Sequence, residues 1–103
     1  MKRIPCEKIT NEPMKSAPPD GDYAVVSCDP SDYVLDKGYT FPWQIAVYRF
    51  KDGQQDVIGH GSSPADLLSK CEVIDKVFLV DLSDDQFDVL EGRLAEKDIV
   101  LVA

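Results

Sequence analysis

The sequence predicts one small α+β domain, in which a β-hairpin and a C-terminal βαβ unit form a mixed β-sheet. The βαβ unit is indicated by two apolar, β-branched runs, over 74–82 and 98–102, which an amphipathic helix joins. The hairpin is indicated by alternating apolar residues before Asp52-Gly53, a strong signal for a two-residue turn. We expect two helices, packed on one face of the sheet.

The helix over 84–96 is the best specified element of the chain. Ser83 and Gln86 have the spacing of a capping box, in which each side chain accepts a hydrogen bond from the backbone N–H of the other residue. Large apolar side chains recur at helical spacing: Phe87, Leu90 and Leu94. Gly92 weakens the helix interior by about 1 kcal/mol relative to alanine, which suggests a packing reason for this glycine.

The hairpin is expected to join strands over 43–51 and 54–61. A two-residue turn implies four cross-strand pairs: Arg49 with Asp56, Tyr48 with Val57, Val47 with Ile58, and Ile45 with His60. A three-residue loop would shift the second arm by one residue, so the register stays open. A short helix follows over 64–71, with Ser63 as its cap and Asp66 completing a variant capping box.

The chain divides into an N-terminal stretch over 1–19 and a single domain over 20–103. The N-terminal stretch contains four prolines and little periodicity, so we expect either a flexible arm or an edge strand. Pro5 would be tolerated at a sheet edge but not at a sheet centre. The domain begins with a strand over 22–28.

The net charge of the chain indicates which class of partner it can bind. The 19 acidic and 11 basic residues give a formal net charge of −8. Such a surface repels phosphate, so we expect no direct binding to nucleic acid or to membranes, and a basic protein surface is the expected partner. No apolar run approaches the ~20 residues that span a bilayer, and the first residues do not resemble a secretory signal. We therefore expect a cytoplasmic protein.

The chain lacks the residue patterns of known catalytic, metal and cofactor sites. Its three cysteines are widely spaced and its single histidine is His60, so no zinc ligand set is present. The Lys of a phosphate-binding loop is missing after Gly59-His60-Gly61. We expect no cofactor and no metal, assign no catalytic residue, and favour a protein that is not an enzyme.

An aromatic and acidic segment is the strongest functional signal. It contains the residues Tyr33, Tyr39, Phe41 and Trp43 together with Asp29, Asp32 and Asp36. Aromatic side chains anchor protein interfaces, and carboxylates steer a basic partner towards them. The first hypothesis is therefore a non-enzymatic interaction or inhibitory module directed at a basic partner. The alternative is that Phe41 and Trp43 belong to the core of the following strand.

Two further hypotheses remain. A small-molecule-binding protein, or a minor enzyme, could use a pocket near the residues His60, Gly61, Ser62 and Ser63, where glycines and a helix start allow a ligand to approach. This reading requires a concave cavity with His60 in its wall. The third hypothesis is a self-associating structural protein, a homo-oligomer that pairs an edge strand over 1–10 or 43–51.

Overall fold

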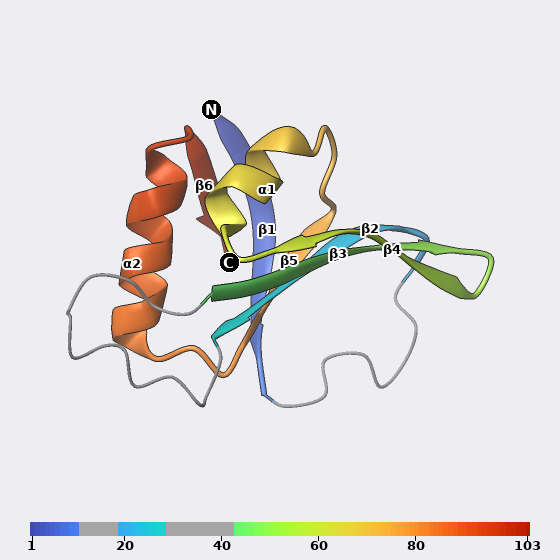
Figure 1. Ribbon diagram of the computed structural model, residues 1–103, viewed down its shortest axis with the longest axis horizontal. Coiled ribbons are helices and arrows are strands. Elements are labelled where there is room, and N and C mark those ends of the chain that lie inside the picture. The colour runs from blue at the N-terminus through green and yellow to red at the C-terminus, as the bar shows by residue number, and fades with distance from the viewer. Residues whose placement is uncertain (11–18, 29–42) are drawn as a thin grey trace.

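The computed structural model describes residues 1–10, 19–28 and 43–103 of the chain. Its elements are β1 (Lys2–Ile9), β2 (Gly21–Cys28), β3 (Trp43–Lys51), β4 (Gln54–Gly61), α1 (Pro64–Lys70), β5 (Lys76–Val80), α2 (Asp84–Ala95) and β6 (Ile99–Val102). The strands form one mixed sheet in the order β4-β3-β2-β5-β1-β6, and both helices pack on one face of it (Figure 1). The predicted α+β class is confirmed.

The C-terminal βαβ unit is present, but in split form. Strands β5 and β6 are both parallel to β1, as the crossover pattern predicts, and β1 lies between them in the sheet. Strand β2 is parallel to β5 on the other side, and the antiparallel strands β3 and β4 complete the sheet. The N-terminal strand therefore joins the two halves of the C-terminal unit.

Strand β1 is neither a flexible arm nor an edge strand, which corrects the expectation for this part of the first nineteen residues. Residues 2–5 pair with β6, and residues 6–9 pair with β5. The N–H of Lys2 points at β6, and N–H directions alternate along a strand, so the nitrogen of Pro5 points towards β5. The pairing of β1 with β5 begins only at the next residue, Cys6, so no hydrogen bond is lost at Pro5. The side-chain ammonium of Lys2 also donates to the carbonyls of Leu68 and Cys71 at the end of α1.

Alternate side chains of the strands form two separate apolar clusters. The larger one lies under the helices, and its most buried members include Ile4, Leu68, Leu79, Leu90 and Leu94. The smaller one lies on the opposite face and centres on Tyr23, Phe50 and Phe78. The rings of Tyr23 and Phe50 meet edge to face, with centroids 5.6 Å apart. Both faces of the central strands are therefore apolar.

The two helix starts differ in their capping. At α2 both predicted bonds are present: the Ser83 N–H donates to the Gln86 side chain at 2.8 Å, and the Gln86 N–H donates to the Ser83 hydroxyl at 3.2 Å. At α1 the helix begins at Pro64 as predicted, but the Ser63 side chain makes no capping bond. The predicted Ser63–Asp66 capping box is therefore wrong, and only the Ser63 carbonyl joins the helix, accepting from the Leu67 N–H.

The hairpin register is confirmed near the turn and shifts beyond it. Asp52 and Gly53 both have positive φ, as a type I′ turn requires, and Arg49 lies opposite Asp56. Ile58 is an extra residue, so that Val47 faces Gly59 instead of Ile58, and His60 faces Ala46 instead of Ile45. This β-bulge accommodates one additional residue in the outer strand.

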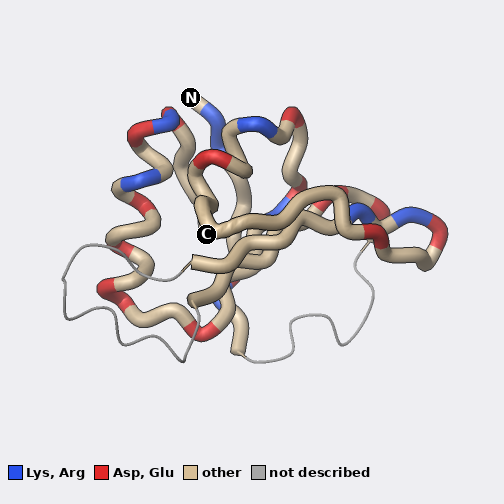
Figure 2. Tube along the Cα trace, in the orientation of Figure 1, with Lys and Arg blue, Asp and Glu red and all other residues tan. Residues whose placement is uncertain are grey.

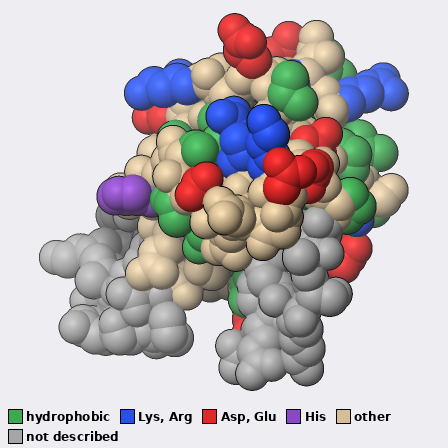
Figure 3. Space-filling view, turned by 90° about the vertical axis from the view of Figure 1, so that its right-hand side faces the viewer, with side chains coloured by type: hydrophobic (Ala, Val, Ile, Leu, Met, Phe, Trp, Pro, Cys, Tyr) green, Lys and Arg blue, Asp and Glu red, His purple; other side chains and the backbone are tan. Residues whose placement is uncertain are grey.

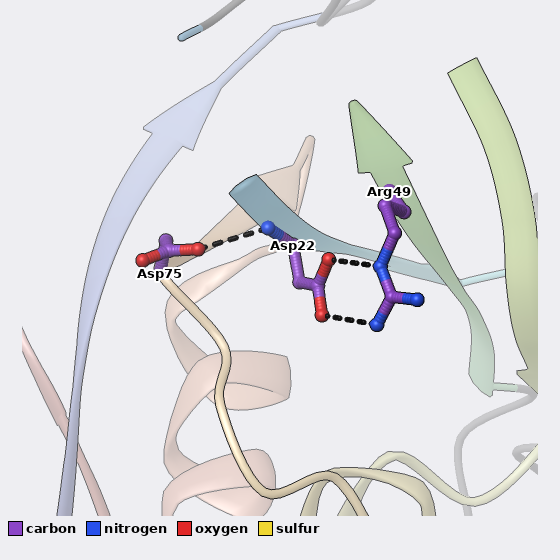
Figure 4. A network of polar contacts seen from close by, with 3 residues as sticks. All are labelled: Asp22, Arg49 and Asp75. Carbon is purple, nitrogen blue, oxygen red and sulfur yellow. Dashed lines mark hydrogen bonds and ion pairs between the residues drawn. The ribbon is translucent and has the colours of Figure 1, made fainter. Parts of the chain in front are cut away.

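The start of β2 is fixed by a network of three charged residues (Figure 4). Arg49 donates two hydrogen bonds to the Asp22 carboxylate, at 2.9 and 3.1 Å, and the Asp22 N–H donates to the Asp75 carboxylate at 2.8 Å. A Cβ at Gly21, whose φ is +155°, would lie 2.6 Å from that Asp75 oxygen. Glycine is therefore required at this position, where the residue before β5 lies against the start of β2.

Candidate functional site

The predicted aromatic and acidic surface changes once the fold is known. Trp43 is only 6% exposed and belongs to the core beneath the helices, so the core interpretation holds for this residue. A buried indole cannot anchor a partner on this surface. The other members of the predicted set lie outside the described residues: Tyr33, Tyr39, Phe41, Asp29, Asp32 and Asp36.

The sheet face opposite the helices contains a hollow beside His60. Its volume is about 390 Å³, and its lining comes from β2, β3 and β4. Ser27, Gln44 and His60 contribute hydrogen-bonding groups, while Val25 and Ala46 contribute apolar surface. Of the other predicted ligand-binding residues, Gly61 lines this hollow and Ser62 and Ser63 do not. The structure thus brings His60 to the wall of a concave site.

Acidic residues recur along the first turns of α2 and just before it (Figure 2). Five exposed carboxylates belong to the segment 81–92, which contains no lysine or arginine: Asp81, Asp84, Asp85, Asp88 and Glu91. None of the five forms an ion pair with another described residue. The nearby cation of Lys8 lies over the Phe87 ring, 4.5 Å from its centroid. We call these five residues the α2 acidic surface.

At the hairpin end of the molecule, acidic and basic side chains lie close together. Asp22 of β2 is paired there with Arg49 of β3, and Glu7 is paired with Lys76 at 3.2 Å between the inner strands β1 and β5. Figure 3 shows this end of the molecule, where lysine and arginine side chains lie among acidic ones. The segment 81–92 differs in that it holds five exposed carboxylates and no lysine or arginine.

A groove separates α2 from β6, the strand at one end of the sheet. It has a volume of about 350 Å³. Gly92 and Ala95 line it from the helix, Ile99 and Leu101 from the strand, and Glu91 of the α2 acidic surface also borders it. Beyond its chain neighbours and the backbone of its own helix, Gly92 has no described heavy atom within 4 Å of the place where a Cβ would stand. We call this feature the α2–β6 groove.

Cys6, whose thiol senses the charge of Glu91 on α2, is not an activated nucleophile. Burial, reinforced by the negative charge of Glu91, raises the pKa of the Cys6 thiol above its usual range, although Lys8 opposes the shift. A thiol with a raised pKa stays protonated at neutral pH and reacts slowly. Within the described ranges, moreover, no three His, Cys, Asp or Glu side chains gather so that they could hold a metal ion.

Neither helix of the described chain has the length and apolar character needed to cross a membrane. No family model matches the chain, and comparisons with curated proteins and with solved structures likewise find no match.

Proposed function

We propose that this chain is a non-enzymatic protein-binding module of the cytoplasm, which docks a basic protein surface through α2. The observation that carries this proposal is the uncompensated α2 acidic surface, on a chain with a formal net charge of −8. Exposed charges of one sign attract a partner of the opposite sign and accelerate its association.

Helix capping accounts for only part of this acidity. Asp84 and Asp85 lie in the first turn of α2, where carboxylates interact favourably with the helix dipole. Asp88 and Glu91 lie beyond that turn, and Asp88 follows Asp84 by four residues. Like charges at this spacing destabilise a helix by about 0.2–0.5 kcal/mol per pair. A basic partner would relieve this repulsion. Binding therefore explains the position of these carboxylates, whereas the stability of the helix does not.

The test compares two variants with equal charge changes. One carries Asp84→Asn, Asp85→Asn and Asp88→Asn on α2, and the other carries Asp52→Asn, Asp56→Asn and Glu72→Gln elsewhere. Each serves as bait in a lysate of the source cells at low salt, with captured proteins identified by mass spectrometry. We expect a basic protein to bind the wild type and the second variant, but not the α2 variant. Equal retention or equal loss in both variants contradicts the proposal.

The hollow at His60 supports a second candidate, a small-molecule-binding function on the opposite face. Its specific support is a lining that combines hydrogen-bonding side chains with apolar ones, which is the usual composition of ligand sites. The test is a thermal-shift screen of a metabolite library on the wild type and on Ala46→Leu, which fills the hollow. A compound that stabilises only the wild type supports this candidate, with Val57→Leu on the outer strand as the matched control. If no compound distinguishes Ala46→Leu from the control, the candidate fails.

A further inference from the structure

We infer that the α2–β6 groove accepts an extended, basic segment of another protein, which adds to the sheet as a strand beside β6. This inference rests on the proposed function, because it names the mode of binding and the chemical class of the partner. It depends on three features of the groove, namely its free backbone groups, its small side chains and its charge.

The outer edge of β6 has backbone groups available for a further strand. Within the described part of the chain β6 pairs only with β1, and the Asp98 carbonyl accepts the Lys2 N–H. Because backbone groups alternate in direction along a strand, Val100 also points at β1, whereas Ile99 and Leu101 direct their N–H and C=O groups outwards. An added strand would find two donors and two acceptors there.

The groove has room for the side chains of such a strand. Alternate residues of an added strand would point towards α2, where Gly92 and Ala95 leave space, and the others would lie beside Val100 and Val102 on the opposite face. These two valines are 36% and 42% exposed. The absence of any described atom near a Gly92 Cβ means that packing among the described residues does not require this glycine. A large side chain at this position, by contrast, would occupy the groove.

The charge around the groove selects the occupant. Glu91 borders the groove, and Asp88 lies three residues before it on the same helix. Lysine or arginine next to apolar residues in the added strand would complement these carboxylates. A second copy of this chain fits less well, because pairing β6 with β6 across a two-fold axis would bring two α2 acidic surfaces onto the same face of the joined sheet.

The experiment selects peptides from a displayed random library on the wild-type protein. It then measures their affinity for Gly92→Ala, which keeps the groove open, and for Gly92→Leu, which fills it. Both substitutions improve helix propensity, so folding should survive, and Ala95→Leu provides a second way to fill the groove. We expect enriched peptides to alternate apolar residues with Lys or Arg. They should bind Gly92→Ala like the wild type and Gly92→Leu more weakly by about tenfold or more.

A structural readout separates strand addition from simple charge attraction. In the complex with an enriched peptide, the amides of Ile99 and Leu101 should exchange with solvent more slowly, while the Val100 amide, directed at β1, serves as the internal control. Basic peptides that bind Gly92→Leu and Ala95→Leu like the wild type, but lose affinity for the α2 asparagine variant, overturn the inference and leave the proposed function standing. Enrichment of peptides without basic residues contradicts both. A concentration-dependent dimer that Gly92→Leu abolishes would identify a second copy as the occupant and overturn the inference.

Discussion

The two edges of the sheet are built in opposite ways. Strand β4 spans eight residues, carries the charge of Asp56, and contains a bulge at Ile58, and all of its residues except Gly59 are exposed. Strand β6 has the sequence Ile-Val-Leu-Val, with no charge, proline or bulge, and among the described residues it pairs with β1 alone. Bulges and charges prevent edge strands from pairing with other chains. The charge and the bulge at β4, and their absence from β6, accord with the proposal that β6 is the edge that accepts a partner.

The two ends of the molecule also differ in side-chain packing, and this difference gives the largest expected effect on stability. Leu90 of α2 is 1% exposed in the core, whereas Ile58 of β4 is 43% exposed. We expect Leu90→Ala to lower the free energy of unfolding by about 2–5 kcal/mol, because it leaves a cavity, and Ile58→Ala to change it by less than about 0.5 kcal/mol. Urea denaturation followed by circular dichroism measures both values. Similar losses in the two variants would show that the β4 edge is packed as firmly as the helix.

The second effect concerns how β1 is held beside the open edge. The ammonium of Lys2 donates to two carbonyls at the end of α1, so Lys2→Met should lower the free energy of unfolding by about 1–2 kcal/mol. Arg3→Met removes the same charge from an exposed neighbour and should have little effect. Thermal unfolding of the two variants makes the comparison. If Arg3→Met costs as much as Lys2→Met, the loss reflects net charge and not the contacts with α1.

The sequence allowed prediction where a few neighbouring residues determine the structure. The α2 capping box depends on Ser83 and Gln86 alone, and the hairpin turn depends on Asp52 and Gly53. The α1 box failed although its spacing was suitable, because a pattern of residue types does not fix the rotamer of Ser63. Local signals therefore located both helix starts but determined the bonds at only one.

The remaining features depend on contacts between distant segments. The place of β1 between β5 and β6 brings together residues about seventy or more positions apart in the sequence. Pro5 suggested an edge strand because the sequence does not show that β1 changes its partner from β6 to β5 directly after this residue. That insertion also makes β6 an edge strand, so the α2–β6 groove could not be predicted either. The one signal for the groove was Gly92 within a helix, and its meaning depends on what lies beside it.

The third effect compares the two helix starts directly. Ser83→Ala removes one bond of the capping box and leaves the Gln86 N–H without its acceptor, so the free energy of unfolding should fall by about 1 kcal/mol. Ser63→Ala should cost clearly less, since the Ser63 side chain makes no such bond. Chemical denaturation of both variants provides the measurement. An equal cost at Ser63 would mean that its hydroxyl caps α1 in solution.

The smallest effect tests whether the carboxylates of α2 are uncompensated. The pKa of the Cys6 thiol is raised above its usual 9.0 by burial first and by Glu91 second. Removing that negative charge with Glu91→Gln should lower the pKa, which increases the thiolate fraction at a fixed pH and so accelerates alkylation by iodoacetamide. Burial remains in the variant, so the pKa should stay above its usual value.

Peptide mass spectrometry follows Cys6 separately from the other two cysteines, and Glu7→Gln provides the control, because the Glu7 carboxylate is paired with Lys76 on the other face of β1. The raised pKa also has a consequence for stability. Because folding favours the protonated thiol, its contribution is fully present below pH 9.0 and is lost as the pH rises through the higher pKa of the folded state. Glu91→Gln should weaken this alkaline loss. If alkylation accelerates equally in Glu7→Gln, the negative field is not specific to α2, and the contrast between the two regions fails.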